Sequence, residues 1–285
     1  MTIEFDNLRQ WVGRKESRTD TIDAWPVAAL SATLDRNDPE PKPGDALPPG
    51  WHWLYFLETK PASELGPDGH PRRGGFLPPV PLPRRMWAGG RIEFLRPLHI
   101  GDAVRRDSEI VSVEPKHGRS GDLVFVTVRH TVSANGEAAV REEHDIVYRE
   151  AAKPGEPAPM GKPAPANAAW QRSLVGDPVL LFRYSALIFN AHRIHYDLDY
   201  VRDEEHYPGL IVHGPLQTTL LLDLCRRHEP RPVQRLEYRA LHPVFHTERF
   251  TVNGNPGAEG NSVDLWTANA AGNYAMTGTA LITAN

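Results

Sequence analysis

The chain has 285 residues, of which 40% are hydrophobic and 24% are charged, the composition of an ordinary globular protein rather than of a disordered or fibrous one. Its length is about twice the ~100–150 residues common for one domain, so we expect two domains. The formal net charge of −4 and the scattered basic residues argue against a nucleic-acid partner.

The sequence offers no sign of a membrane segment. No apolar run approaches the ~20 residues that a membrane span needs. Glu4, Asp6 and Arg9 stand where a signal peptide would have its apolar core. We therefore expect a cytoplasmic protein without a membrane partner.

The first part of the chain is predicted to form helices followed by an antiparallel meander. Helices are expected at residues 7–11 and 22–34, the second because Val27, Leu30 and Leu34 fall on one helical face. Apolar and polar residues then alternate, which predicts strands at residues 52–56, 91–94, 108–113, 123–128 and 143–148. This order of elements indicates an α+β class.

Residues 61–85 form a long segment rich in proline, glycine and arginine. Ordered loops of this length are usually functional or mobile. The segment contains four arginines that are candidates for contact with ligand phosphates or a substrate carboxylate, Arg72, Arg73, Arg84 and Arg85. The alternative is a solvated loop with incidental charge.

A second proline-rich segment divides the chain. Residues 151–168 alternate proline with small residues and have no apolar periodicity, which is typical of a semi-rigid linker. The linker separates an N-terminal half, residues 1–150, from a C-terminal half, residues 169–285.

The C-terminal half repeats the plan of the first. His213, Gly214 and Pro215 are predicted to open a helix that runs to about Arg227, with glycine before and proline just inside its start. Strands are expected at residues 235–241, 247–253, 262–268 and 274–282. Each half is thus predicted to be a helix wrapped by an antiparallel sheet. Cys225, the single cysteine, is expected to be a buried apolar residue, and one cysteine excludes an internal disulfide.

Polar, titratable and aromatic residues are concentrated in residues 182–200, just before this helix. Asn190 and His195 would point to different sides of a regular helix, because five residues turn by roughly 140°. If both side chains contact one ligand, the segment must be irregular. His192 and His195 have the spacing of a metal pair, but no third ligand stands at a motif spacing, so we expect no metal.

These residues suit the addition of water to an unsaturated thioester. Histidine has a pKa near neutrality and can take a proton from water, so His195 is the candidate base. The amide of Asn190 can hold the water, and backbone N–H groups beginning at Gly214 can stabilise negative charge. The alternative is structural, with His195 a satisfied core residue, Asn190 a turn or cap residue and Gly214 merely a helix start.

The segment resembles the MaoC-like hydratases and dehydratases of the hotdog fold, whose motif Asp-x-Asn-Pro-x-His precedes the central helix. The matching residues are Asn190-Ala191-His192-Arg193-Ile194-His195, and Val212-His213-Gly214 matches the histidine-glycine pair before that helix. The variant resembles most the type 2 hydroxyacyl-thioester dehydratases and the bacterial mesaconyl-C4-CoA and itaconyl-CoA hydratases, which join two hotdog units in one chain.

The resemblance implies a double hotdog whose two sheets join, with one active site per chain, because the N-terminal half lacks the motif. It implies catalytic roles for Asn190, His195 and Gly214. The residues it suggests for substrate contact are Tyr184, Arg193, His213 and the four arginines of residues 61–85. The family carboxylate is Asn190 here and cannot accept a proton, so His195 would be the main acid–base group, unless Asp197 or Asp199 supplies a carboxylate.

The resemblance favours a hydro-lyase that hydrates a short enoyl-CoA, with C5 dicarboxyl thioesters such as itaconyl-CoA or mesaconyl-CoA as preferred substrates. It implies no cofactor, because coenzyme A is part of the substrate. The alternatives are a 3-hydroxyacyl-thioester dehydratase of fatty acid synthesis, a hotdog thioesterase or a non-catalytic acyl-CoA-binding module. Exposed sheet edges would also permit a homo-oligomer.

Overall fold

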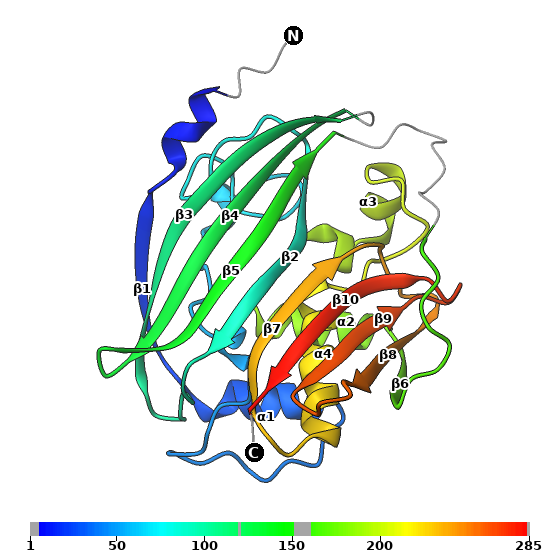
Figure 1. Ribbon diagram of the computed structural model, residues 1–285. Helices are drawn as coiled ribbons and strands as arrows, with labels where there is room; N and C mark the ends of the chain where they lie inside the picture. Colours follow the sequence, from blue (N-terminus) through cyan, green and yellow to red (C-terminus); the bar gives the residue numbers. More distant parts are fainter. Residues whose placement is uncertain (1–5, 119–120, 151–160, 284–285) are drawn as a thin grey trace.

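The computed structural model describes residues 6–118, 121–150 and 161–283. Within these residues ten strands form one antiparallel sheet, in the order β1-β3-β4-β5-β2-β7-β10-β9-β8-β6 (Figure 1). The strands of the N-terminal half are β1 (Lys15–Thr21), β2 (Arg84–Phe94), β3 (Ala103–Gly118), β4 (Gly121–Ala134) and β5 (Glu137–Arg149). Those of the C-terminal half are β6 (Trp170–Val175), β7 (Val233–Ala240), β8 (Arg249–Pro256), β9 (Ser262–Ala268) and β10 (Tyr274–Ile282).

The helices lie on the concave side of this sheet (Figure 1). They are α1 (Ala24–Thr33), α2 (Pro178–Leu187), α3 (Leu198–Asp203) and α4 (Gly214–His228), with 3-10 turns η1 (Asp6–Trp11), η2 (Trp51–Leu54), η3 (Ala62–Glu64) and η4 (Arg193–His195). None of the helices in the described ranges has the length and apolarity that crossing a bilayer requires.

The two halves join where β2 pairs with β7. Ile92 lies opposite Leu236, and Gly90 lies opposite Tyr238. A side chain at Gly90 would collide with both neighbouring strands, because its Cβ would lie 2.4 Å from the carbonyl oxygen of Glu143 and 2.6 Å from the Tyr238 hydroxyl. Glycine at this position therefore allows the seam to close, and the predicted joining of two sheets is confirmed.

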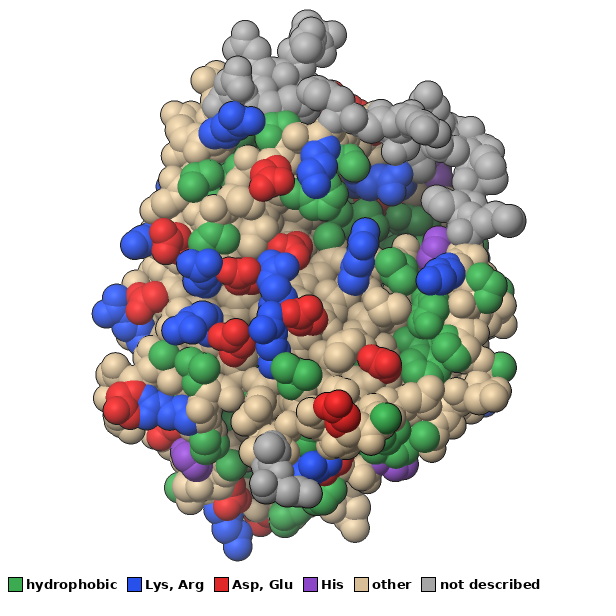
Figure 2. Space-filling view, viewed as in Figure 1, with side chains coloured by type: hydrophobic (Ala, Val, Ile, Leu, Met, Phe, Trp, Pro, Cys, Tyr) green, Lys and Arg blue, Asp and Glu red, His purple; other side chains and the backbone are tan. Residues whose placement is uncertain are grey.

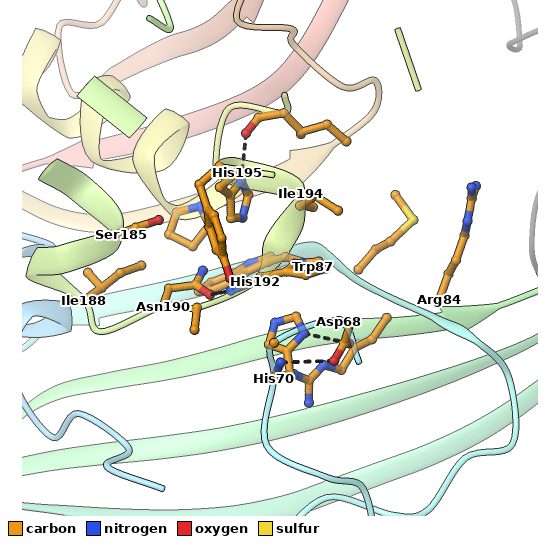
Figure 3. A pocket seen from close by; sticks show the side chains of 18 of the residues that line it. Asp68, His70, Arg84, Trp87, Ser185, Ile188, Asn190, His192, Ile194 and His195 are labelled. Carbon is orange, nitrogen blue, oxygen red and sulfur yellow. Dashed lines mark hydrogen bonds and ion pairs between the residues drawn. The ribbon is translucent and has the colours of Figure 1, made fainter. Parts of the chain in front are cut away.

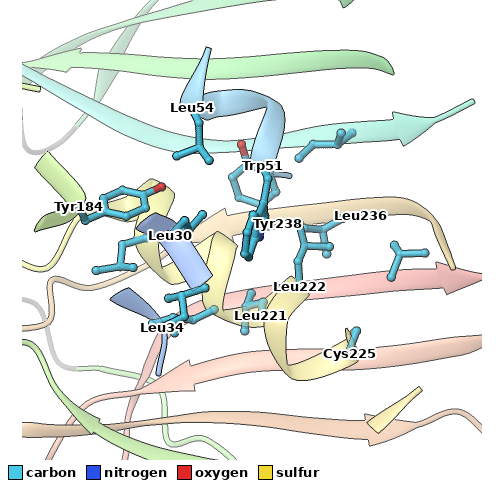
Figure 4. Close-up of a cluster of buried hydrophobic side chains, with 14 of the residues drawn as sticks. Leu30, Leu34, Trp51, Leu54, Tyr184, Leu221, Leu222, Cys225, Leu236 and Tyr238 are labelled. Carbon is cyan, nitrogen blue, oxygen red and sulfur yellow. The ribbon is translucent and has the colours of Figure 1, made fainter. Parts of the chain in front are cut away.

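The C-terminal sheet wraps α4. The leucines of this helix are buried on all sides, as expected for a helix enclosed by a sheet and its neighbours. Figure 4 shows Leu221 and Leu222 packed among residues of both halves, including Trp51 and Leu236. Cys225 is 1% exposed in this cluster, so the prediction that it is a buried apolar residue is confirmed.

At one end of the N-terminal sheet α1 packs against α2 and η2, and elsewhere an irregular segment covers the sheet. Val80 and Leu82, from the segment between α1 and β2, pack against Ile110, Val126 and Tyr148 of β3, β4 and β5. Residues 61–85 are therefore not merely a solvated loop, because part of the segment fills the concave face that a longer helix would otherwise cover. The same segment places residues 65–71 next to the C-terminal half.

The outer face of the sheet is polar. Figure 2 shows basic and acidic side chains interleaved over the N-terminal strands. Arg91 of β2 forms ion pairs with Glu143 and Asp145 of β5, and Arg129 of β4 also pairs with Glu143. Such partly exposed pairs contribute little stability, and they indicate that this face contacts solvent.

Several predicted elements differ from the structure. The strand expected at residues 52–56 is wrong, because Trp51–Leu54 form the 3-10 turn η2, where consecutive side chains are buried and the chain enters through Gly50 at φ 83°. Sequence reasoning also missed β1 and β6, which are the edge strands of the sheet. Edge strands lack the apolar alternation of central strands, so their sequences carry a weak signal.

Part of the predicted linker lies against the C-terminal half. Pro163 forms a β-bridge with Asn273, and the N–H of Ala164 donates to the carbonyl of Gly272 at 2.9 Å. The rest of the linker, residues 151–160, lies outside the described residues.

Candidate active site

A cavity of about 1100 Å³ lies between the two halves. The N-terminal half lines it with residues of the 58–71 segment and with Arg84–Ala88 at the start of β2. The C-terminal half contributes α2, η4, the first residues of α4 and residues 240–243. Figure 3 shows that Asn190, His192 and His195 share this space with Asp68 and His70. The motif segment therefore opens onto a cleft rather than into dry core.

His195 lies at the end of η4 and is buried. Its Nδ1 lies 2.7 Å from the carbonyl oxygen of Ile211. A carbonyl oxygen only accepts, so Nδ1 must carry the hydrogen and Nε2 keeps a free lone pair. Burial lowers the pKa of His195 to about 4, so the ring is neutral at pH 7. A neutral imidazole with a free Nε2 can accept a proton.

Asn190 follows α2 in an irregular turn. Its N–H donates to the carbonyl of Ser185 at 2.8 Å, and the preceding Phe189 adopts a left-handed φ of 49°. The Asn190 side-chain oxygen accepts the backbone N–H of His192 at 2.9 Å. This bond fixes the amide so that its NH₂ group, a donor of two hydrogen bonds, is left for a ligand. The segment is therefore irregular, as it must be if Asn190 and His195 contact one ligand.

Gly214 begins α4 and lines the same cavity. The first amides of a helix have no intrahelical acceptor, so the N–H of Gly214 can donate to a ligand. The N-terminal end of the helix dipole also favours negative charge there. A thioester oxygen that gains charge during a reaction is the kind of acceptor that this position suits.

Four imidazoles form a row beside these groups. The ring centroids of His70 and His192 are 4.0 Å apart, those of His192 and His195 are 5.4 Å apart, and those of His195 and His213 are 3.5 Å apart. Burial lowers the pKa of each ring. Asp68 is the one carboxylate that bonds to this row among residues 6–118, 121–150 and 161–283.

The N-terminal half supplies Asp68 and His70. The Asp68 carboxylate accepts Nδ1 of His70 at 2.9 Å and the backbone N–H of His70 at 3.0 Å. The carbonyl of Asp68 accepts the N–H of Arg193 at 2.9 Å, which docks this turn onto the motif segment. Sequence reasoning did not single out the two residues. Asp68-Gly69 is a turn signal, and a histidine directly after such a turn could have marked the place.

Glycine at residue 69 makes this docking possible. Gly69 has φ +86°, and a Cβ there would lie 1.9 Å from the carbonyl oxygen of Ala191. The two loops therefore approach too closely for any side chain. The positive φ also disfavours every residue other than glycine.

The structure places several predicted substrate contacts outside the cavity. Tyr184 is 1% exposed, with its hydroxyl 3.2 Å from the hydroxyl of Thr219. His213 is completely buried behind His195. Arg193 pairs with Asp197 on the surface side of the motif. These three side chains have no direct access to a ligand in the cavity, so we assign them to supporting the site.

Of the four candidate arginines, two lie outside the cavity and two line it. Arg72 bonds the carbonyl of Leu65, and Arg73 bonds three carbonyls of residues 80–83, so both are occupied in holding the 61–85 segment. Arg84 lines the cavity but pairs with Glu205. Arg85 also lines the cavity, and no carboxylate within the described ranges forms an ion pair with it. Arg85 is therefore the arginine best placed to meet an acidic ligand.

Asp197 and Asp199 do not replace the family carboxylate in this arrangement. The carboxylate of Asp197 accepts the N–H of Tyr200, which caps α3, and it pairs with Arg193 at 2.8 Å. Asp199 lies in the first turn of α3. Neither side chain lines the cavity.

Two groups of described residues bring three metal-ligating atoms within 4.8 Å of one another. One is Asp68, His70 and His192 at the cavity, and the other is His130, Glu142 and His144 in the N-terminal half. In the first group Nδ1 of His70 is bonded to Asp68. In the second, the buried Glu142 accepts Nε1 of Trp53 and contacts His52. Both carboxylates thus already accept hydrogen bonds within the protein.

The fold and the cavity define a hotdog protein of the hydratase and dehydratase class, and comparison with known proteins agrees. A family model described as hydroxyacyl-thioester dehydratase type 2 matches residues 50–246. A mesaconyl-C(4)-CoA hydratase of Chloroflexus aurantiacus is 47% identical over 258 residues, 90% of each chain. The chain therefore belongs to the hydroxyacyl-thioester dehydratase type 2 family, and it is a hydro-lyase.

Solved structures support the fold. A MaoC-like dehydratase of Phytophthora capsici superposes with a TM-score of 0.68 at 12% identity, covering 99% of both chains. A Mycobacterium tuberculosis protein described as a double hotdog superposes with a TM-score of 0.58 at 16% identity, covering 98% of both chains. The predicted double hotdog is confirmed.

Proposed function

We propose that this enzyme reversibly hydrates a short enoyl-CoA that carries a second, free carboxylate, a C5 dicarboxyl thioester such as mesaconyl-CoA or itaconyl-CoA. The relative at 47% identity is named a mesaconyl-C(4)-CoA hydratase. The observation that carries the proposal is that Asn190, His195 and Gly214 all line one cavity. We further propose a cytoplasmic enzyme that needs no cofactor beyond the coenzyme A of its substrate and that self-associates through edge strands β1 and β6.

In this proposal His195 is the base. Its Nε2 takes a proton from water while the water oxygen bonds to the β-carbon of the substrate. The electrons of the carbon–carbon double bond move toward the thioester oxygen, where the N–H of Gly214 stabilises the charge. Asn190 donates from its amide to the water and orients it. The α-carbon takes up one proton in exchange for the one held by His195, which completes the addition of one water.

Arg85 is proposed to bind the free carboxylate. The guanidinium group forms bidentate bonds with carboxylates and keeps its charge at all working pH values. The other cavity-lining arginine, Arg84, is engaged by Glu205 and lies over the ring of Tyr207. A thioester without a free carboxylate would not use Arg85.

The experiment compares four thioesters, crotonyl-, octenoyl-, mesaconyl- and itaconyl-CoA, with the wild type and Arg85→Met. We expect the wild type to prefer a dicarboxyl thioester. The Arg85→Met variant should lose at least ~10-fold in kcat/KM with that substrate and less than ~3-fold with crotonyl-CoA, since a charge-assisted pair contributes about 1.5–3 kcal/mol. Arg72→Met is the matched control, because Arg72 is exposed outside the cavity. Equal losses with both substrates would contradict the role of Arg85.

A longer acyl chain is the alternative that the cavity allows. Its volume of about 1100 Å³ and apolar lining residues such as Met86, Phe189 and Leu241 suit a fatty acyl group. Preference for octenoyl-CoA would favour a 3-hydroxyacyl-thioester dehydratase of fatty acid synthesis. Release of free thiol would indicate a thioesterase, and saturable binding without turnover would indicate a binding module.

A further inference from the structure

Asp68 and His70 belong to the N-terminal half yet lie in the cavity of the C-terminal motif. Figure 3 shows the Asp68 carboxylate bonded to His70, whose ring lies next to that of His192. Both residues line the cavity. The carboxylate accepts two N–H groups of His70, so the imidazole is held in one orientation. An imidazole held by a carboxylate is a common acid–base arrangement in enzymes.

Hydration needs a second acid–base group besides His195, because one proton leaves the water and another is added to the α-carbon. Within the part of the chain that the structure describes, a proton taken by His195 meets no carboxylate, because that ring contacts the Ile211 carbonyl and two other imidazoles. His70 is the ring beside the cavity whose positive charge a neighbouring carboxylate stabilises. An imidazolium at His70 would therefore keep a carboxylate within hydrogen-bond distance.

We propose that His70 is a second catalytic acid–base residue, which exchanges a proton with the α-carbon, and that Asp68 is its positioning residue. The proposal rests on the proposed function and deepens it. In hydration, His195 takes one proton from water as the oxygen bonds to the β-carbon. The electron pair of the double bond then takes the proton of the His70 imidazolium at the α-carbon. One proton afterwards returns from His195 to His70 through solvent, so water is the net addition.

Dehydration runs these steps in reverse. Neutral His70 removes the α-proton, the electron pair of that C–H bond forms the double bond, and the hydroxide leaves with a proton from His195. The N-terminal half would then supply the acid–base group that Asn190 cannot provide. The site would be completed by both halves of the chain.

The charge around His70 sets the expected pH dependence. Burial lowers the pKa of His70, Asp68 raises it, and Arg85 and Arg73 lower it. His192 faces the same ring. Removing the negative charge at Asp68 leaves only effects that lower the pKa of His70. The alkaline limb of the hydration pH profile, where His70 loses its proton, should therefore move to lower pH in Asp68→Asn.

The experiment uses the full chain with four variants, His70→Gln, Asp68→Asn, Asp68→Glu and His99→Gln. His99 and Asp102 form a partly exposed histidine–carboxylate pair outside the cavity, so His99→Gln is the matched control. We expect His70→Gln to lower kcat by ~10²-fold or more, the usual contribution of an acid–base group. The Asp68→Glu variant should retain part of the kcat that the Asp68→Asn variant loses. Circular dichroism and the melting temperature check that each variant is folded.

A second measurement is the deuterium isotope effect at the α-carbon of the substrate. In dehydration of the α-deuterated 3-hydroxyacyl thioester, His70→Gln should raise the deuterium isotope effect on kcat, because removal of the α-proton becomes slower. A His70→Gln variant within ~3-fold of the wild type would overturn the proposal. So would an Asp68→Asn variant with lower activity and an unchanged pH profile, which would indicate a merely structural role. Loss of activity on dialysis against EDTA, with recovery on adding Zn²⁺, would also overturn the proposal. Asp68, His70 and His192 would then hold a cation.

The failure of this proposal differs from the failure of the proposed function. If the wild type hydrates none of the four thioesters, the function is wrong. If the wild type is active and His70→Gln is equally active, the function stands and only the role of His70 is lost.

Discussion

His195 lies face to face with His213, with ring centroids 3.5 Å apart and an interplanar angle of 19°. His213 is completely buried, and its Nε2 lies 2.8 Å from the hydroxyl of Ser185. The stack fixes the plane of the His195 ring, while the bond to the Ile211 carbonyl fixes its tautomer. The fold thus aims the free Nε2 of His195 without using a carboxylate.

The stack can be tested with His213→Ala. Removing the ring would let His195 tilt, and small displacements of a catalytic group cost up to ~10²-fold in rate. We expect kcat to fall by ~10-fold or more while KM changes little. Steady-state kinetics check this. An unchanged kcat in a folded variant would show that the stack does not orient His195.

The proposed base is tested by His195→Ala. Without an acceptor for the proton of water, kcat should fall by at least ~10²-fold. Asn190→Ala should have a smaller effect, on the order of 10-fold, because an oriented water is lost but the base remains. Stopped assays of hydration and dehydration should show the same losses in both directions. Activity within a few-fold of wild type in His195→Ala would remove this assignment.

The docking of the two loops is tested by Gly69→Ala. A methyl group at residue 69 would overlap the carbonyl oxygen of Ala191, so the turn carrying Asp68 and His70 must move away. We expect kcat/KM to fall by at least ~10-fold with a small change in melting temperature. Gly44→Ala is the matched control, because Gly44 also has a positive φ of 90° but its Cβ would meet nothing within 4 Å. Equal effects of the two changes would indicate backbone strain alone.

A buried charge network ties the helices together. Asp223 of α4 is 1% exposed at its side chain and pairs with Arg36 at 2.6 Å, Arg227 at 2.7 Å and Arg172 at 3.1 Å. Removing the negative charge leaves three guanidinium groups facing one another. We expect Asp223→Asn to lower the free energy of unfolding by ~3 kcal/mol, measured by urea denaturation. The exposed Asp264→Asn should change it by less than ~0.5 kcal/mol.

Stability should fall in mild acid. Burial lowers the pKa of His195 to about 4 and lowers the pKa of His130, His192 and His213, so these rings are neutral in the folded protein. In the unfolded chain they take up protons below about pH 6.5, so the unfolded state binds more protons and the free energy of unfolding decreases as the pH falls. From pH 6.5 to 5.5 the loss should reach about 1 kcal/mol for each ring.

Urea denaturation at pH 7.5, 6.5 and 5.5 measures this effect. His195→Asn should show a weaker dependence than the wild type, because one of the titrating rings is gone. A protein equally stable or more stable at pH 5.5 would contradict the neutral state of these histidines.

The local pattern of the sequence determined much of the fold. The strands β9 and β10 begin and end at the predicted residues, and α4 begins at Gly214, within the predicted His213-Gly214-Pro215 start. These elements depend on apolar periodicity and on helix-start residues, which act over a few positions. The motif from Asn190 to His195 was also recognisable, because its residues are consecutive.

Tertiary structure alone decided how the cavity is completed. Asp68 lies more than a hundred residues from His192, and no periodicity relates the two positions. They meet because Gly69 allows the two loops to dock and because the N–H of Arg193 bonds the Asp68 carbonyl. Tertiary structure also sorted the arginines, leaving Arg85 facing the cavity while Arg73 was taken up by carbonyls. Hydrogen bonds between distant segments depend on how the whole chain packs, and a local pattern does not encode them.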